Sequence, residues 1–160
     1  MRHAKSDWSA DHGSDHDRPL NDRGVRSARV MGELLAREDL VPELVISSTA
    51  HRARRTAEIA IESGGWDARL VLDPAFYGSG VAEVIEVASS APPVQRLMLV
   101  GHQPTWSMLV AALSGQRVEM KTATVAIIEF GFDDWPALTE RRGRVVEVLQ
   151  PRDHLGSTSD

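Results

Sequence analysis

Residues 43–65 read ELVISSTAHRARRTAEIAIESGG, and this stretch decides the fold. Residues 44–46 form a short, fully apolar run of the kind that is buried in a parallel sheet. A helix is expected over about 50–63, where apolar side chains recur at helical spacing. Gly64-Gly65 would end it. Strand, turn and helix in this order are typical of an α/β protein.

The rest of the chain repeats this alternation. Further strands are expected at 70–72, 97–100, 125–130 and 145–149, and further helices at 22–37, 81–88 and 106–113. Asn21 is a good N-cap for the first of these helices. The last two strands would pair with each other. The pattern predicts a three-layer α/β/α sandwich around a mostly parallel sheet.

Composition limits the classes of protein to consider. The chain has 160 residues, of which 42% are hydrophobic, so one domain over 1–150 with a polar tail over 151–160 is expected. The formal net charge is −5, which argues against a nucleic-acid partner. There is no cysteine and no apolar run of membrane-spanning length. We therefore expect a cytoplasmic monomer that does not bind membranes.

Polar and basic side chains follow the predicted strands. Three groups of residues come directly after a strand: Ser47-Ser48, Asp73 and Gly101-His102. Arg52 lies in the first turn of the helix that follows the strand at 44–46. Ligands of such folds bind at the carboxyl ends of the strands, so Arg52 and His102 should converge. Arg2-His3 would join them if a strand precedes it. An arginine fork matches phosphate oxygens, and a neutral imidazole can attack phosphorus.

The segment 7–18 carries two histidines among aspartates, His12 and His16. Such a pair can indicate a metal site, but Gly13 and Ser14 make a helix unfavourable there. We therefore interpret the segment as a solvated loop and expect no metal or other cofactor.

Four motifs together resemble those of the histidine phosphatase superfamily, and most of all its small SixA-type phosphohistidine phosphatases. They are Arg2-His3-Ala4-Lys5-Ser6, Arg18-Pro19-Leu20 with Asn21, Ser47 to Arg52 with Thr56, and Gly101-His102-Gln103-Pro104. The resemblance covers nearly the whole chain and implies a phosphoglycerate-mutase-like fold.

The resemblance also implies roles for individual residues. His3 would be the nucleophile, Arg2 and Arg52 would hold the phosphoryl oxygens, and His102 would be the second histidine of the phosphate pocket. Arg18, Ser6 and Gly101 would contribute to substrate binding. Fixed positive donors suit phosphoryl transfer, because charge spreads over three equatorial oxygens.

Two departures from the family pattern stand out. The family has an apolar strand before its Arg-His pair, whereas only Met1 precedes Arg2 here. We therefore expect a sheet that lacks its first strand and hypothesise that the natural protein begins upstream. If Met1 is the true start, His3 would lie on a frayed terminus and activity would be weak. The second departure is that no glutamate follows the strand at 70–72, which leaves Asp73 as the nearest candidate acid.

The lack of a clear acid favours a phosphoramidate over an alcohol ester, whose alkoxide must be protonated. The expected function is hydrolysis of phosphohistidine through a phospho-His3 intermediate. The partner would be phosphate or a phosphorylated substrate such as a histidine-phosphorylated protein. The alternatives are a small-molecule or nucleotide phosphomonoesterase, and an inactive phosphate-binding domain.

Overall fold

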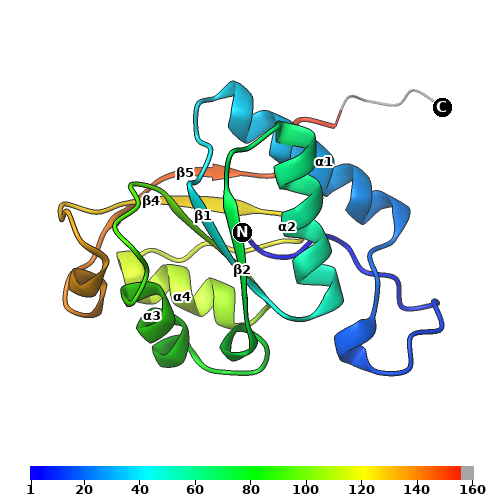
Figure 1. Cartoon of the computed structure of the whole chain (residues 1–160), viewed down its shortest axis with the longest axis horizontal. Coiled ribbons are helices and arrows are strands. Elements are labelled where there is room, and N and C mark those ends of the chain that lie inside the picture. Colours follow the sequence, from blue (N-terminus) through cyan, green and yellow to red (C-terminus); the bar gives the residue numbers. More distant parts are fainter. Residues whose placement is uncertain (156–160) are drawn as a thin grey trace.

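The computed structural model describes residues 1–155 (Figure 1). Its helices are α1 (Asp22–Arg37), α2 (His51–Gly64), α3 (Val81–Ser89) and α4 (Thr105–Ser114). Its strands are β1 (Leu44–Ser48), β2 (Arg69–Asp73), β3 (Leu97–Val100), β4 (Val125–Glu129) and β5 (Arg144–Leu149). Every strand and helix expected from the sequence is present, with ends that differ by at most two residues.

The strands β2, β1 and β3 lie side by side in that order and are all parallel. The strands β4 and β5 form an antiparallel pair, as expected. Side chains of β1 alternate between two cores: Val45 packs with α1 and α2, whereas Leu44 and Ile46 pack with α3 and α4. The two helix pairs thus cover opposite faces of the sheet (Figure 1), and the three-layer α/β fold is confirmed.

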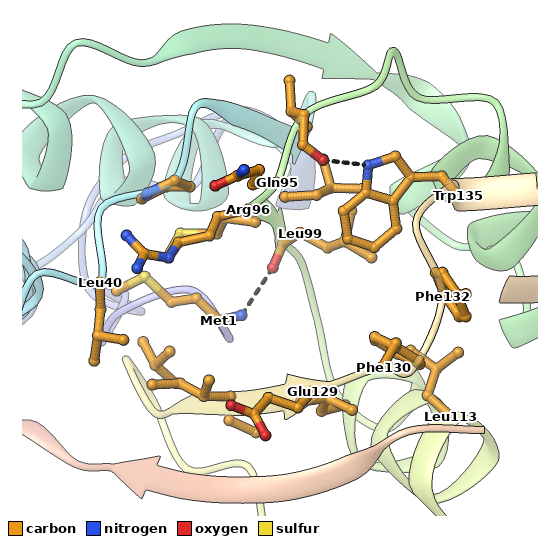
Figure 2. A pocket seen from close by; sticks show the side chains of 18 of the residues that line it. Met1, Leu40, Gln95, Arg96, Leu99, Leu113, Glu129, Phe130, Phe132 and Trp135 are labelled. Atoms are coloured by element: carbon orange, nitrogen blue, oxygen red, sulfur yellow. Dashed lines mark hydrogen bonds between the residues drawn. The ribbon is translucent and has the colours of Figure 1, made fainter.

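The first three residues lie between β3 and the chain just before β4. The His3 amide donates to Gly101 O at 3.0 Å, and the Arg2 amide donates to Thr124 O at 3.0 Å. The Met1 amino group donates to Leu99 O at 2.8 Å (Figure 2). The expectation of a frayed terminus is therefore wrong, because hydrogen bonds on both sides hold this segment, and Arg2 forms a parallel bridge with Gly101.

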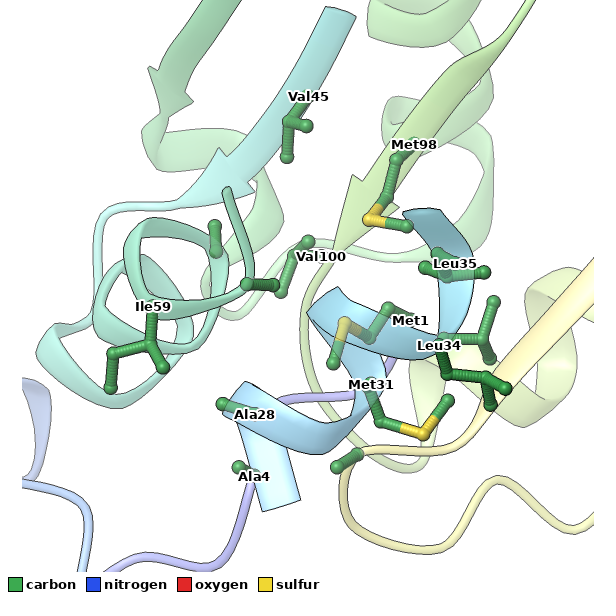
Figure 3. Close-up of a cluster of buried hydrophobic side chains, with 14 of the residues drawn as sticks. Met1, Ala4, Ala28, Met31, Leu34, Leu35, Val45, Ile59, Met98 and Val100 are labelled. Carbon is green, nitrogen blue, oxygen red and sulfur yellow. The ribbon is translucent and has the colours of Figure 1, made fainter. Parts of the chain in front are cut away.

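The helix α1 forms where the sequence predicts it because its start is capped and one side is apolar. The Asn21 side chain accepts a hydrogen bond from the Gly24 amide at 2.8 Å. Met31, Leu34 and Leu35 are buried against the sheet (Figure 3). A Cβ at Gly32 would come within 2.3 Å of a carbonyl oxygen of α2, so only glycine allows this close approach of the helices.

The segment expected as a polar tail, 151–160, begins with a short turn. Pro151–Asp153 form a 3-10 turn, and Pro151 is buried. The remainder of the expected tail, 156–160, lies outside the described residues. No helix in residues 1–155 combines the length and the apolar character needed to cross a membrane.

Candidate active site

The His3 side chain lies at the carboxyl end of the sheet, next to His102. Its Nδ1 lies 2.7 Å from Ala4 O, and since a carbonyl only accepts, Nδ1 carries the proton. Nε2 therefore keeps its lone pair. Burial lowers the pKa of His3 to about 3, and the charges of Arg52 and Arg2 act in the same direction. The imidazole is thus neutral at physiological pH and fits the requirement for a nucleophile.

His102 lies beside this nucleophile, with ring centroids 5.0 Å apart. Its Nε2 lies 2.8 Å from Ser48 Oγ, which itself accepts a bond from the Ala50 amide. In the tautomer in which the Ser48 hydroxyl donates to His102 Nε2, the ring proton lies on Nδ1. Burial, followed by the charge of Arg52, lowers the pKa of His102 to about 4. His102 is a neutral donor rather than a second charge.

Three buried nitrogen atoms near the nucleophile have no hydrogen-bond partner among the described residues. They are Arg2 Nε, Arg52 Nε and His102 Nδ1. Leaving such donors unpaired costs free energy unless a ligand satisfies them. All three side chains line a cavity of about 210 Å³ together with His3. The sequence-based prediction that Arg2, His3, Arg52 and His102 converge at one rim agrees with this geometry.

Backbone and side-chain contacts fix the nucleophile in place. Thr56 on α2 accepts a hydrogen bond from the Ala4 amide at 2.9 Å and donates to Arg52 O at 2.7 Å. The Thr56 hydroxyl thereby links the backbone of Ala4, the residue after His3, to the backbone of Arg52. Arg2 is held from the other side, where its Nη1 donates to Met120 O at 3.0 Å.

Gly101 acts through its small size. A Cβ there would come within 2.2–2.5 Å of the Trp106 ring, which is 2% exposed. The missing side chain allows the end of β3 to lie against this ring while its carbonyl accepts from the His3 amide. Gly101 contributes shape and a backbone acceptor, whereas the resemblance had implied substrate binding.

Asp15 is the functional candidate that the sequence interpretation missed. Its carboxylate accepts from Arg52 Nη2, Arg18 Nη2 and the Tyr77 hydroxyl, each at 3.0 Å. Arg52 Nη1 also donates to the Asp15 backbone oxygen at 2.7 Å. Partial burial raises the pKa of Asp15, but the bonds from Arg18 and Tyr77 and the charge of Arg52 outweigh it and lower the pKa to about 2. Its position three residues before Arg18 was the only sequence signal.

Arg18 and Ser6 are both buried and line the cavity. Arg18 Nη1 donates to Ser6 Oγ, so these two predicted residues support each other. Trp8 stacks on this guanidinium, with Arg18 Cζ 3.5 Å from the ring centroid, and is 73% exposed. Trp8 is therefore a wall of the entrance rather than a core residue.

Asp73 lies away from this arrangement. Its carboxylate accepts a hydrogen bond from the Ala75 amide at 2.8 Å and caps a 3-10 turn at Pro74–Phe76. It does not line the cavity, and no other carboxylate does so either among residues 1–155. The structure thus brings the proposed donors and the nucleophile together but leaves the candidate acid outside.

The charge around the cavity suits an anion. Four cationic side chains line it: Arg2, Lys5, Arg18 and Arg52. Within the described part of the chain, no group of three or more His, Asp or Glu side chains could hold a metal ion. His12 and His16 instead contact their own loop and Thr49. The donors are the kind that bind phosphate oxygens.

Comparison with known proteins agrees with this chemistry. The model of the histidine phosphatase superfamily (branch 1) matches residues 1–77. An uncharacterised chloroplastic protein of Arabidopsis thaliana is 30% identical over 84% of the chain, which spans 66% of that relative's length. An uncharacterised protein of Mycobacterium leprae is 35% identical over 95% of the chain and 100% of the relative.

A solved structure from Nakamurella multipartitia, provisionally named phosphohistidine phosphatase SixA, is also similar. It is 27% identical, with a TM-score of 0.83, over 94% of this chain and 93% of that one. The family match and this neighbour together support a phosphatase.

Proposed function

Since this chain belongs to the histidine phosphatase superfamily, we propose that it hydrolyses protein phosphohistidine through a covalent phospho-His3 intermediate, without a metal. One observation carries the proposal. His3, whose Nε2 keeps its lone pair, lines a cavity together with Arg2, Arg52 and His102, each of which carries a buried nitrogen that lacks a hydrogen-bond partner among residues 1–155. Such donors would bind the three equatorial oxygens of a transferring phosphoryl group.

The reaction would proceed in two displacements. The Nε2 lone pair of His3 forms a bond to phosphorus while the bond to the substrate's imidazole nitrogen breaks. That nitrogen keeps the electron pair and takes a proton from solvent. Water then attacks phosphorus, the bond to Nε2 breaks and its electrons return to the ring, which releases inorganic phosphate and a proton to solvent.

The acid–base chemistry of the site favours an imidazole leaving group. An alcohol ester would need a positioned acid to protonate its alkoxide. No carboxylate of residues 1–155 lines the cavity, and Asp15, at its edge, has a pKa lowered to about 2. Asp15 is thus ionised at neutral pH and serves to orient Arg18 and Arg52. A cytoplasmic location and a monomeric state remain predictions.

Substrate preference tests the proposal directly. Matched peptides that carry phosphohistidine or phosphoserine are incubated with the chain in the presence of EDTA, and phosphate release is measured. We expect kcat/KM to be at least tenfold higher for phosphohistidine and unaffected by EDTA. Faster cleavage of phosphoserine or of a nucleotide would favour a phosphomonoesterase. Binding of phosphate without turnover of any substrate would favour a phosphate-binding domain.

A further inference from the structure

Trp8 is the most exposed large apolar side chain of residues 1–155, and it lines the cavity that contains His3. One face of its indole stacks on Arg18, which is itself buried and bonded to Asp15 and Ser6. The ring therefore rests on a fixed plane. Since Trp8 is 73% exposed although this face is covered, the opposite face of the indole is open to solvent.

The indole N–H also distinguishes Trp8 from the other three tryptophans. Those of Trp66, Trp106 and Trp135 donate to backbone carbonyl oxygens at 3.0–3.2 Å, which ties their rings into the fold. The N–H of Trp8 has no hydrogen-bond partner in the described part of the chain. The indole of Trp8 thus contacts the protein through one face and leaves its other groups available to a ligand.

The backbone on both sides of Trp8 is held in place. The Asp7 amide donates to Pro19 O at 2.8 Å. The Asp7 carboxylate accepts from the amide of Ser9 at 2.8 Å and from its hydroxyl at 2.7 Å. A tryptophan held in this way offers a large contact area at a low cost in conformational entropy, as aromatic side chains do in binding sites. Trp8 is therefore exposed and preorganised at the same time.

The direction of attack places the leaving group on the side of Trp8. The attacking and leaving atoms are roughly in line during phosphoryl transfer, so the leaving group points away from His3. His3 is buried and Trp8 is exposed, although both line the same cavity, so this direction leads to the entrance. In phosphohistidine the ring nitrogen is bonded directly to phosphorus, and the ring therefore lies at the entrance itself.

We propose that Trp8 is a specificity-determining residue that stacks its open face on the imidazole ring of the phosphorylated histidine. The inference rests on the proposed function, because it takes phosphohistidine as the substrate. Aromatic pairs contribute about twofold to tenfold in affinity beyond the area that they bury. An aliphatic leaving group has no ring to stack. Trp8 would thus select the ring, while Arg18 behind it contributes positive charge to the cavity.

The experiment measures binding of two phosphonates that differ only in the ring, (imidazol-1-yl)methylphosphonate and methylphosphonate. Their carbon–phosphorus bonds are not hydrolysed, so the result does not depend on turnover. Calorimetry gives both dissociation constants for the unaltered chain, Trp8→Ala and Trp8→Phe. Met108→Ala is the control, since Met108 is 58% exposed but does not line the cavity. Acrylamide quenching of fluorescence reports whether Trp8 becomes covered, because Trp66 and Trp106 are buried.

We expect the unaltered chain and Met108→Ala to bind the ring-bearing phosphonate at least about fivefold more tightly, with reduced quenching. Trp8→Ala should lose this preference and Trp8→Phe should retain most of it. No preference in the unaltered chain, or the same preference in Trp8→Ala, would overturn the proposal. Equal weakening of both phosphonates in Trp8→Ala would also overturn it, since Trp8 would then only support Arg18.

Release of phosphate from phosphoimidazole by the unaltered chain tests the proposed function separately. We expect release, with a kcat/KM that Trp8→Ala lowers more for phosphoimidazole than for phosphoramidate, which has no ring. Absence of release with an intact preference for the ring-bearing phosphonate would reject the hydrolysis while still supporting the ring contact.

Discussion

Among single residues, the two cavity histidines give the clearest pH signature. Burial lowers the pKa of His3 to about 3 and that of His102 to about 4, from an ordinary value near 6.5. Well above pH 6.5 both rings are neutral in the folded and in the unfolded chain. They therefore do not make the free energy of unfolding depend on pH in that range. As pH falls below 6.5, only the unfolded chain takes up these protons, and the free energy of unfolding decreases.

We therefore expect both rings to stay neutral at pH 5 and His3 to remain a competent nucleophile there. Proton NMR of the imidazole C–H groups measures this, with His3→Gln and His102→Gln spectra for assignment. Titration of either ring near pH 6.5 would contradict the account.

We expect the planar shape and the several N–H donors of the Arg52 guanidinium to matter more for kcat than its positive charge. Arg52→Lys keeps the charge but cannot contact Asp15 through two nitrogens, and it lacks the buried Nε that has no partner among the described residues. Loss of one preorganised donor costs about a hundredfold to a thousandfold in kcat. Steady-state kinetics with a phosphohistidine peptide measure this. Arg54→Lys is the matched control, since Arg54 is exposed on the same helix and pairs with Glu58; an equal loss there would refute the assignment.

At the level of secondary-structure elements, α2 positions the nucleophile through Thr56. Thr56→Val has nearly the same shape but leaves the buried Ala4 amide without its acceptor. An unpaired buried donor costs about 1–3 kcal/mol, so thermal denaturation should show a clear loss of stability. We also expect kcat to fall more than KM rises, since Ala4 follows His3. Thr56→Ser retains the hydroxyl and should restore both; failure of that rescue would count against the hydrogen bond.

The end of β3 depends on the close contact between Gly101 and Trp106. Gly101→Ala would place a methyl group within 2.2 Å of the ring, and such overpacking typically costs about 1–3 kcal/mol. We expect a lower melting temperature together with reduced kcat, because His102 is the next residue. Gly131→Ala is a suitable comparison, since nothing lies within 4 Å of a Cβ there. A melting temperature equal to that of Gly131→Ala would argue against this role.

The sequence predicts elements well where local and tertiary signals agree. α1 has a capping asparagine and a continuous apolar side, and its bounds match the expectation. The convergence of Arg52 and His102 followed from the rule that parallel strands end at one edge. Asp15 and Trp8 could not be predicted in this way, because their positions depend on the path of the loop at 7–18 rather than on periodicity. The hydrogen bonds of Met1–His3 were missed because three residues carry no strand pattern.

For the whole molecule, function depends on concentrating positive charge within an acidic chain. The net charge is −5, yet four cationic and no acidic side chains from residues 1–155 line the cavity. The sheet brings these groups together from the N-terminal segment, the loop before α1, and α2.

The measurement that tests the central claim most directly is rapid-quench labelling with a radiolabelled phosphohistidine peptide, on the unaltered chain and on His3→Ala. We predict an acid-labile, base-stable phosphoryl adduct that forms within one turnover, maps to His3 and is absent from His3→Ala. Turnover without such an adduct, or an adduct that persists in His3→Ala, would contradict a phospho-His3 intermediate.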